Sequence, residues 1–156
     1  KDFIKEINII FESDLFFVVE TSSKYNLPKK IFKFEDINEN LLETKNQFKK
    51  YSPNDEIIHM IFDKYIFDEN VVIQVNFICL KDQIVDNLKK IFSKYQISVN
   101  RILSYNYLKK HNDYNGEDIM KLADRSINGL IESEVLLANK SPKNLGFFEK
   151  FFNFFS

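Results

Sequence analysis

The sequence predicts an α+β fold, in which a small sheet has helices packed on one face. Apolar runs of strand length alternate with amphipathic runs of helical period, in the order strand, helix, strand, strand, helix, strand between residues 31 and 103. The composition agrees with a folded domain, because 44% of the residues are hydrophobic and 29% are charged. A further helix and an aromatic C-terminal tail are expected after this unit.

The first 30 residues are expected to form an N-terminal β-hairpin and a loop. Residues 7–11 and 15–19 are β-rich apolar runs, and the short polar stretch 12–14 separates them. Residues 21–30 are polar and contain Pro28, so we interpret them as a loop.

Residues 31–108 are expected to form an α+β interaction domain that begins with a short strand at 31–34. Asp36 is predicted to be the N-cap of a helix that runs to residue 51, because Glu39 follows in the capping-box position. Residues 56–62 and 64–67 are then predicted to form strand.

A turn at 68–70 leads to the strongest predicted strand of the chain, at residues 71–80. Asp82 is expected to cap the next helix, and a last strand of the domain is predicted at 97–103. The odd-numbered residues of the strand at 71–80 are apolar and are expected to share one face: Val71, Ile73, Val75, Phe77 and Cys79.

Residues 109–142 are expected to form a linker and a helix. The linker is the polar stretch 109–116, and the helix is predicted at 117–131 because its apolar residues recur at helical spacing. A short strand is predicted at 134–138.

Residues 143–156 form an aromatic tail that is predicted to bind a membrane surface. Its phenylalanines would span about 160° of one helical face, at 100° per residue. The segment is too short to cross a bilayer, which takes about 20 apolar residues, but lysines beside an aromatic face suit anionic headgroups. The alternative is a helix docked on the protein's own core. The predicted membrane-binding residues are Lys143, Phe147, Phe148, Lys150, Phe151, Phe152, Phe154 and Phe155.

No motif for nucleotide or metal binding is evident. A phosphate-binding loop needs closely spaced glycines, whereas Gly116, Gly129 and Gly146 lie far apart. Neither His59 nor His111 has a second metal ligand at a local spacing. We therefore expect a structural role for His59, a solvated position for His111, and neither a metal nor a cofactor.

Catalytic residues are not predicted either. Cys79 is the single cysteine, so no internal disulfide can form and a reducing compartment is expected. Within an apolar strand, Cys79 is expected to be buried and inert rather than a nucleophile. The pairs Asp63 with Asp68 and Asp113 with Asp118 could serve as catalytic carboxylates, but acidic residues are common at turns and helix caps.

A nucleic-acid partner is not expected. The basic residues Lys109 and Lys110 lie near Tyr105, Tyr107 and Tyr114, and such a combination can stack on nucleic acid. The net charge of the chain is −1, however, and nucleic-acid binding usually needs a concentrated basic face. We interpret the cluster as a solvated loop beside tyrosines that pack on a strand.

The middle of the chain contains Ile57-Ile-His-Met-Ile-Phe-Asp-Lys-Tyr-Ile-Phe-Asp68, then the strand at 71–80, then a helix with Asn87-Leu-Lys-Lys and a final strand. These segments resemble the inserted α+β subdomain of FtsA, a bacterial actin-like division protein. Residues 7–19 are similar to the first strand pair of that family's core, and the aromatic C-terminus is similar to its membrane-targeting helix. The resemblance covers roughly residues 31–108, with looser similarity at both ends.

The sequence also departs from this family. Phe62 stands where the family usually has proline, and the glycine-rich stretch expected between Asp68 and Val71 is absent. The phosphate loops and most of the actin-like core have no counterpart, so the resemblance implies neither ATP binding nor polymerisation through that core. It implies a protein-interaction domain and a lipid-binding tail.

We therefore expect a non-enzymatic, membrane-associated interaction protein of bacterial cell division, peripheral to the cytoplasmic face of the inner membrane. Its expected partners are an anionic membrane surface and either a protein of the division machinery or a second copy. The alternative is a soluble adaptor related to pilus or secretion assembly proteins, with the tail packed on its own core or on a second protomer. A small enzyme that uses His59, Asp63 or Asp68 is a third and weaker hypothesis.

Overall fold

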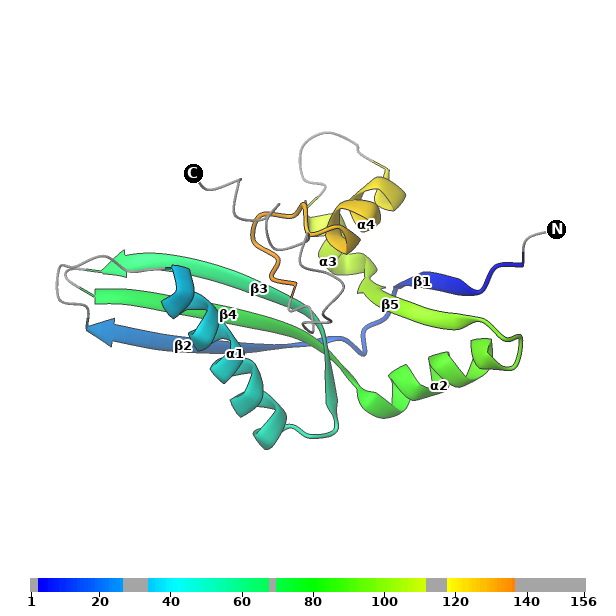
Figure 1. The fold of residues 1–156 in the computed structure, drawn as a ribbon, viewed down its shortest axis with the longest axis horizontal. Helices are drawn as coiled ribbons and strands as arrows, with labels where there is room; N and C mark the ends of the chain where they lie inside the picture. The colour runs from blue at the N-terminus through cyan, green and yellow to red at the C-terminus, as the bar shows by residue number, and fades with distance from the viewer. Residues whose placement is uncertain (1–2, 27–33, 68–69, 112–117, 137–156) are drawn as a thin grey trace.

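A computed structural model of the chain describes residues 3–26, 34–67, 70–111 and 118–136, and it confirms the α+β class (Figure 1). In chain order, the strands and helices are β1 (Glu6–Phe11), β2 (Phe17–Asn26), α1 (Phe34–Tyr51), β3 (Asp55–Phe67), β4 (Asn70–Lys81), α2 (Asp82–Ser93), β5 (Ser98–Ser104), α3 (Tyr105–His111) and α4 (Ile119–Ile127).

Three strands form an antiparallel sheet in the order β2-β4-β3. Ile73, Val75, Phe77 and Cys79 of β4 are buried, as the sequence alternation predicted. They pack with Leu41 and Phe48 of α1, which lies across this face of the sheet (Figure 1). The centroids of the Phe48 and Phe77 rings are 5.0 Å apart, a distance typical of paired aromatic side chains.

The other two strands, β1 and β5, form a separate parallel pair. On one side, Ile9 and Val99 pack with Leu88 of α2. On the other side, Ile10 and Leu103 pack in a cluster that includes residues of α3 and α4. The pair is therefore covered by helices on both sides, as parallel strands usually are.

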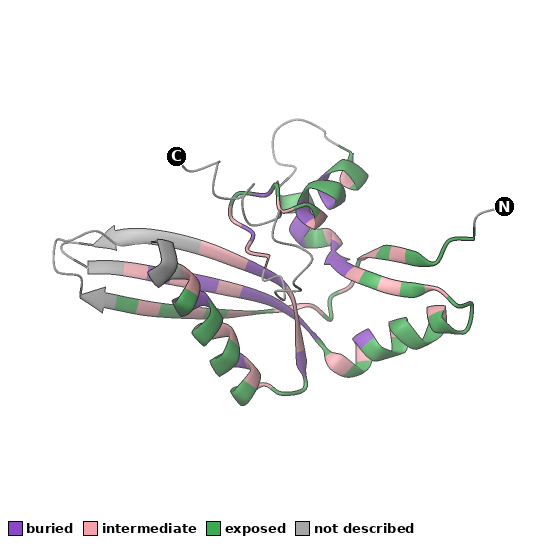
Figure 2. Cartoon of the chain, in the orientation of Figure 1, coloured by how far each residue is buried: buried purple, intermediate pink, exposed green. Residues whose placement is uncertain are grey.

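The two sheets meet where β4 and β3 approach β5. Ile78 belongs to the cluster beneath α3 and α4, whereas Leu80 belongs to the cluster beneath α2. Buried residues concentrate around this junction (Figure 2). The last described segment, residues 131–136, lies along β3, because the amide of Phe62 donates to Ser133 and the amide of Val135 donates to Met60.

The predicted N-terminal hairpin is wrong, although both of its strands exist. β1 pairs with β5 and β2 pairs with β4, so the two strands belong to different sheets. The reason is that each strand buries its apolar residues in a different cluster, Ile9 beneath α2 and Phe17 beside α1. The predicted loop at 21–30 is also wrong as far as Asn26, because β2 extends to Asn26 and pairs with β4 over the whole length of β2.

Both predicted aspartate caps are wrong. α1 already begins at Phe34, so Asp36 lies inside its first turn and residue 34 is helical rather than part of a strand. α2 has Lys81 as its N-cap, without a side-chain hydrogen bond. Lys81 is also the last residue of β4 and pairs with Asp55, so the chain passes from strand to helix with no loop for Asp82 to close.

The region after β5 differs from the prediction in three ways. The predicted linker at 109–116 begins inside α3, which the sequence analysis missed, and α4 is shorter than the predicted helix at 117–131. Asp118 caps α4, since its side chain accepts a hydrogen bond from the Met120 amide. Instead of a strand at 134–138, the described part of that segment makes one isolated bridge, between Glu134 and Ile61.

Among the described residues, no helix is long and apolar enough to span a membrane.

Candidate functional site

Residues from β3, β5, α3, α4 and the segment after α4 form a buried polar cluster. We call it the His59 cluster. It is the main group of buried side chains, in the described part of the chain, of the types that take part in acid–base or nucleophilic chemistry. It lies at the junction of the two sheets. Its members are His59, Arg101, Ser104, Tyr107, Ser126 and Glu134.

An irregularity in β3 positions His59. The pairing of β3 with β4 shifts register between Ile57 and His59, so Ile58 is an extra residue and His59 lies opposite Ile78. The side chain therefore points to the face of the sheet opposite α1, where it is 1% exposed. Both ring nitrogens are within hydrogen-bonding distance of buried partners.

The two contacts of His59 define which nitrogen carries the proton. The backbone amide of Ser104 can only donate, and it lies 2.9 Å from Nε2, so Nε2 accepts. Nδ1 then carries the hydrogen and donates to Oε1 of Glu134 at 2.7 Å. His59 is thus a neutral ring held between a backbone donor and a carboxylate.

Glu134 is the charged centre of the cluster and is 1% exposed. Its second oxygen accepts a hydrogen bond of 2.6 Å from the hydroxyl of Ser126. Arg101 supplies the opposite charge, with Nη2 3.7 Å from the carboxylate and Nη1 donating to the Ser126 carbonyl at 3.1 Å. The buried carboxylate is therefore both hydrogen-bonded and partly neutralised.

Tyr107 closes the cluster on the side of α3. Its ring centroid lies 4.2 Å from that of His59, and its backbone amide donates to the Ser104 hydroxyl at 3.3 Å. Burial and the nearby negative charge of Glu134 raise the pKa of the Tyr107 hydroxyl above its usual value, so the phenol stays protonated.

Ser126, His59 and Glu134 are the residue types of a hydrolase triad, but they are joined in a different order. In a triad the serine hydroxyl donates to the histidine, and the histidine donates to the acid. Here Ser126 donates directly to Glu134, and the far nitrogen of His59 is occupied by the Ser104 amide. His59 is therefore not placed to take the Ser126 proton. The cluster instead links β3, β5, α3 and α4 to the segment 131–136.

The structure also gives the positions of the other candidate residues. Cys79 is buried and free, and burial, followed by the negative charge of Asp55, raises its pKa to about 12. Cys79 is thus inert, as expected. His59 is structural, as expected, because both nitrogens are bonded inside the core.

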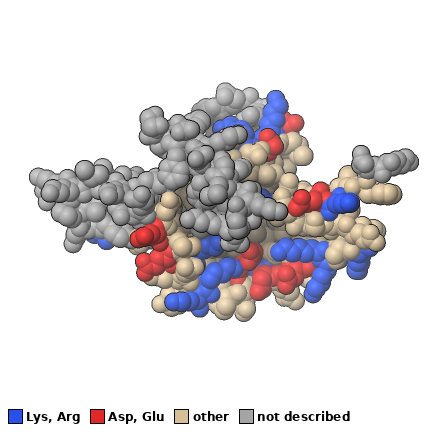
Figure 3. All heavy atoms as spheres, in the orientation of Figure 1, with Lys and Arg blue, Asp and Glu red and all other residues tan. Residues whose placement is uncertain are grey.

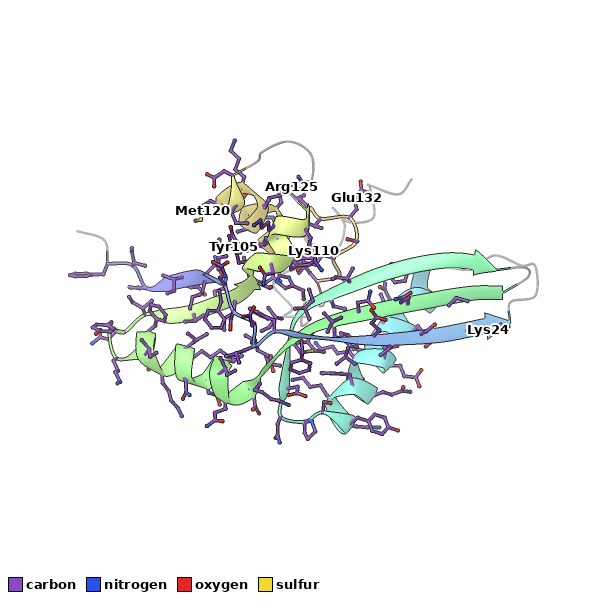
Figure 4. All side chains as sticks on the ribbon, turned by 180° about the vertical axis from the view of Figure 1, so that it is seen from behind. Lys24, Tyr105, Lys110, Met120, Arg125 and Glu132 are labelled. Carbon is purple, nitrogen blue, oxygen red and sulfur yellow. The ribbon has the colours of Figure 1, made fainter. Side chains whose placement is uncertain are left out.

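The remaining candidates are either dispersed or not described. Asp118 is a helix cap, and the Lys109 ammonium lies 5.9 Å from the centroid of the Tyr105 ring. Figure 4 shows the neighbours Tyr105 and Lys110 on α3 and Arg125 on α4. The structure does not describe Asp68, Asp113, Tyr114, or the side chains of Asp63 and His111; all the predicted membrane-binding residues, from Lys143 to Phe155, lie outside its described ranges.

No metal site is evident among the described residues, since no three His, Cys, Asp or Glu side chains are grouped to hold an ion. Sequence analysis did not find Arg101, Ser126 or Glu134. One indication was available for a partner, because His59 interrupts an apolar run and buried polar groups are usually paired, but Glu134 follows two other polar residues and does not stand out in the sequence.

No protein-family profile matches this chain, and no curated protein is similar to it.

Proposed function

We propose that the chain is a non-enzymatic, membrane-associated interaction protein, similar to a reduced FtsA, that acts at the cytoplasmic face of a bacterial cell membrane. One observation carries the proposal. The segment 146–156 contains six of the chain's seventeen phenylalanines, and a helix would place them on one face beside Lys143 and Lys150. Such a face suits burial among anionic lipid headgroups.

The His59 cluster supports this proposal through its position in the chain. It fixes Glu134 to β3 and α4, only nine residues before Lys143. A tail that binds lipid would therefore hold the folded domain close to the bilayer. One short helix binds weakly and reversibly, so self-association would increase the time that the protein spends on the membrane.

The proposal predicts that the intact chain sediments with anionic vesicles. Replacing Phe151 and Phe152 by serine removes two aromatic side chains from the lipid-facing side, and binding should weaken by about tenfold or more. The measurement is co-sedimentation with vesicles of equimolar phosphatidylcholine and phosphatidylglycerol. Asn153→Ser, on the polar side of the same helix, is the matched control and should bind as the native chain does.

Equal sedimentation of the native chain and the Phe151→Ser/Phe152→Ser variant would contradict the proposal.

The alternative, a soluble adaptor, is favoured by the open strand edges. Within the described residues, the outer edges of β1 and β2 have no neighbouring strand, and such edges accept a strand from a partner. If the double serine variant changes a dimer into a monomer in light scattering, while vesicle binding is absent in both proteins, the adaptor replaces the membrane proposal.

A further inference from the structure

One end of the folded domain combines exposed apolar side chains with lysines. We call it the basic end. The N-terminal segment and the α2–β5 turn lie together there (Figure 1), because the amide of Ser98 donates to the Lys5 carbonyl at 2.9 Å. The basic end consists of Phe3, Ile4, Lys90, Ile91, Lys94 and Tyr95.

The apolar members of the basic end are strongly exposed. Phe3 is 84% exposed, Tyr95 72%, Ile4 69% and Ile91 51%. Elsewhere on α2 the apolar side chains behave differently, since Val85 is buried in the cluster beneath the helix. Four exposed large apolar side chains at one end are therefore a feature of this surface rather than of the whole helix.

Lysines run beside these apolar side chains. Lys90 and Ile91 lie in the last turn of α2, and Lys94 and Tyr95 follow directly after the helix ends at Ser93, so two lysines and two apolar side chains alternate at this end of the helix. Lys5 and Lys89 flank them. Figure 3 shows basic side chains, with some acidic ones among them, over the lower right of the molecule, where Figure 1 places α2.

The lysines of this end are not used in ion pairs with other described residues. Lys49 and Lys81 each pair with a carboxylate, whereas Lys90 and Lys94 do not. Two acids are close in sequence, Asp86 one turn before Lys90 and Glu6 at the start of β1, against the four lysines. The helix dipole favours lysines at the end of α2, but it does not account for the apolar side chains beside them.

We propose that the basic end is a second membrane contact, in which Lys90 and Lys94 bind anionic lipid headgroups while Phe3, Ile4 and Tyr95 enter the interface. Charge complementarity identifies this occupant, because an apolar surface edged by lysines that form no ion pair with another described residue matches an anionic bilayer. The inference rests on the proposed function, since the tail would bring the domain to the same bilayer. Residues 137–146 reach at most about 35 Å, so the domain stays near the surface.

The test compares vesicle binding of four full-length proteins: the native chain, Lys90→Gln/Lys94→Gln, the tail variant Phe151→Ser/Phe152→Ser, and a control. The control, Lys110→Gln/Lys121→Gln, removes the same charge from exposed lysines of α3 and α4. Each lysine near an anionic surface strengthens binding by about fivefold, so the Lys90→Gln/Lys94→Gln variant should bind at least about tenfold more weakly. The control should bind within about twofold of the native chain, and vesicles of phosphatidylcholine alone should remove the difference.

A label at the basic end gives an independent measurement. Tyr95→Cys, coupled to an environment-sensitive dye, should shift to shorter emission wavelength when anionic vesicles are added. The same dye on Met120→Cys, which is exposed on α4, should not shift. The native thiol does not interfere, because Cys79 is buried and its pKa is raised to about 12.

The outcomes separate the two proposals. If the native chain and the Lys90→Gln/Lys94→Gln variant bind equally and the dye at residue 95 does not shift, the second contact is overturned while the tail keeps its role. If only the tail variant binds as the native chain does, the tail proposal fails and the second contact stands. If the native chain does not bind anionic vesicles at all, both are overturned.

Discussion

The burial of Glu134 and the burial of His59 each depend on the hydrogen bond between the two side chains. A carboxylate without water is costly unless it is hydrogen-bonded and neutralised, and Glu134 has His59, Ser126 and Arg101 for this. His59 in turn would bury an unpaired N–H without the carboxylate. The cluster therefore contributes to stability mainly through what is lost when one member is removed.

Replacing Glu134 by alanine should lower the free energy of unfolding by about 3–5 kcal/mol, because it leaves His59, Ser126 and Arg101 without their acceptor. Urea unfolding measures the change. Glu132→Ala is the control, since Glu132 is exposed two residues away and its loss should change stability by less than about 0.5 kcal/mol. Similar losses for the two variants would show that the cluster does not stabilise the fold.

The raised pKa of the Cys79 thiol predicts that the stability of the folded chain falls as the pH rises. Burial raises its pKa from 9.0 to about 12 in the folded chain, so its stabilising contribution is complete below pH 9 and is lost as pH rises toward 12. From pH 9 to 10.5 the native chain should lose about 2 kcal/mol more than Cys79→Ala. Urea unfolding at both pH values measures this, and parallel losses would contradict the assigned cause.

Single residues could be predicted only in part. A structural role for His59 and the burial of Cys79 within an apolar strand were predicted, and the structure confirms both. The partner of His59 could not be predicted, because Glu134 is 75 residues away in the sequence and only the fold brings them together. Local patterns carry no information about such a pair.

At the scale of elements, the periodicity of the sequence predicted where the strands lie more reliably than it predicted which strands pair with each other. β4 and β5 lie within one residue of their predicted bounds, because alternation and helical spacing are local properties. The pairing of β1 with β5 was missed, since a short polar stretch between two strands favours a hairpin. α3 was missed because it follows β5 without an intervening turn, and because its last three residues, 109–111, are basic and were assigned to a polar linker.

The turn between α2 and β5 contains a residue under backbone strain. Gln96 has a φ of 59°, in the left-handed region that side chains other than glycine rarely adopt. Gln96→Gly should raise the free energy of unfolding by about 0.5–1 kcal/mol, because glycine adopts this conformation without a clash. The measurement is again urea unfolding.

The same substitution in a helix is the control for Gln96. Gln47→Gly, at an exposed position of α1, should lower the free energy of unfolding by about 1 kcal/mol. Opposite signs at the two positions would identify φ as the cause, and losses at both would contradict it.

The whole molecule is an α+β fold, as the order of strand and helix patterns predicted. The sequence did not indicate two sheets with three apolar clusters, because Ile78 and Leu80, only two residues apart on β4, contribute to different clusters. In the sequence, a strand whose residues contribute to different apolar clusters along its length cannot be distinguished from a strand that is buried on both faces. The proposed membrane tail depends on the spacing of phenylalanines and lysines in the sequence, and vesicle binding will test it.

The pairing of β1 with β5 also bears on how the chain folds during synthesis. Lys5 and Ser98, which are bonded at one end of the pair, are 93 residues apart in the sequence. A ribosome adds about 5–20 residues per second, so the apolar side chains of β1 wait roughly 5–20 s for their partner strand. During that interval the sheet β2-β4-β3 can already form, and β1 is the strand most available to chaperones or to misfolding.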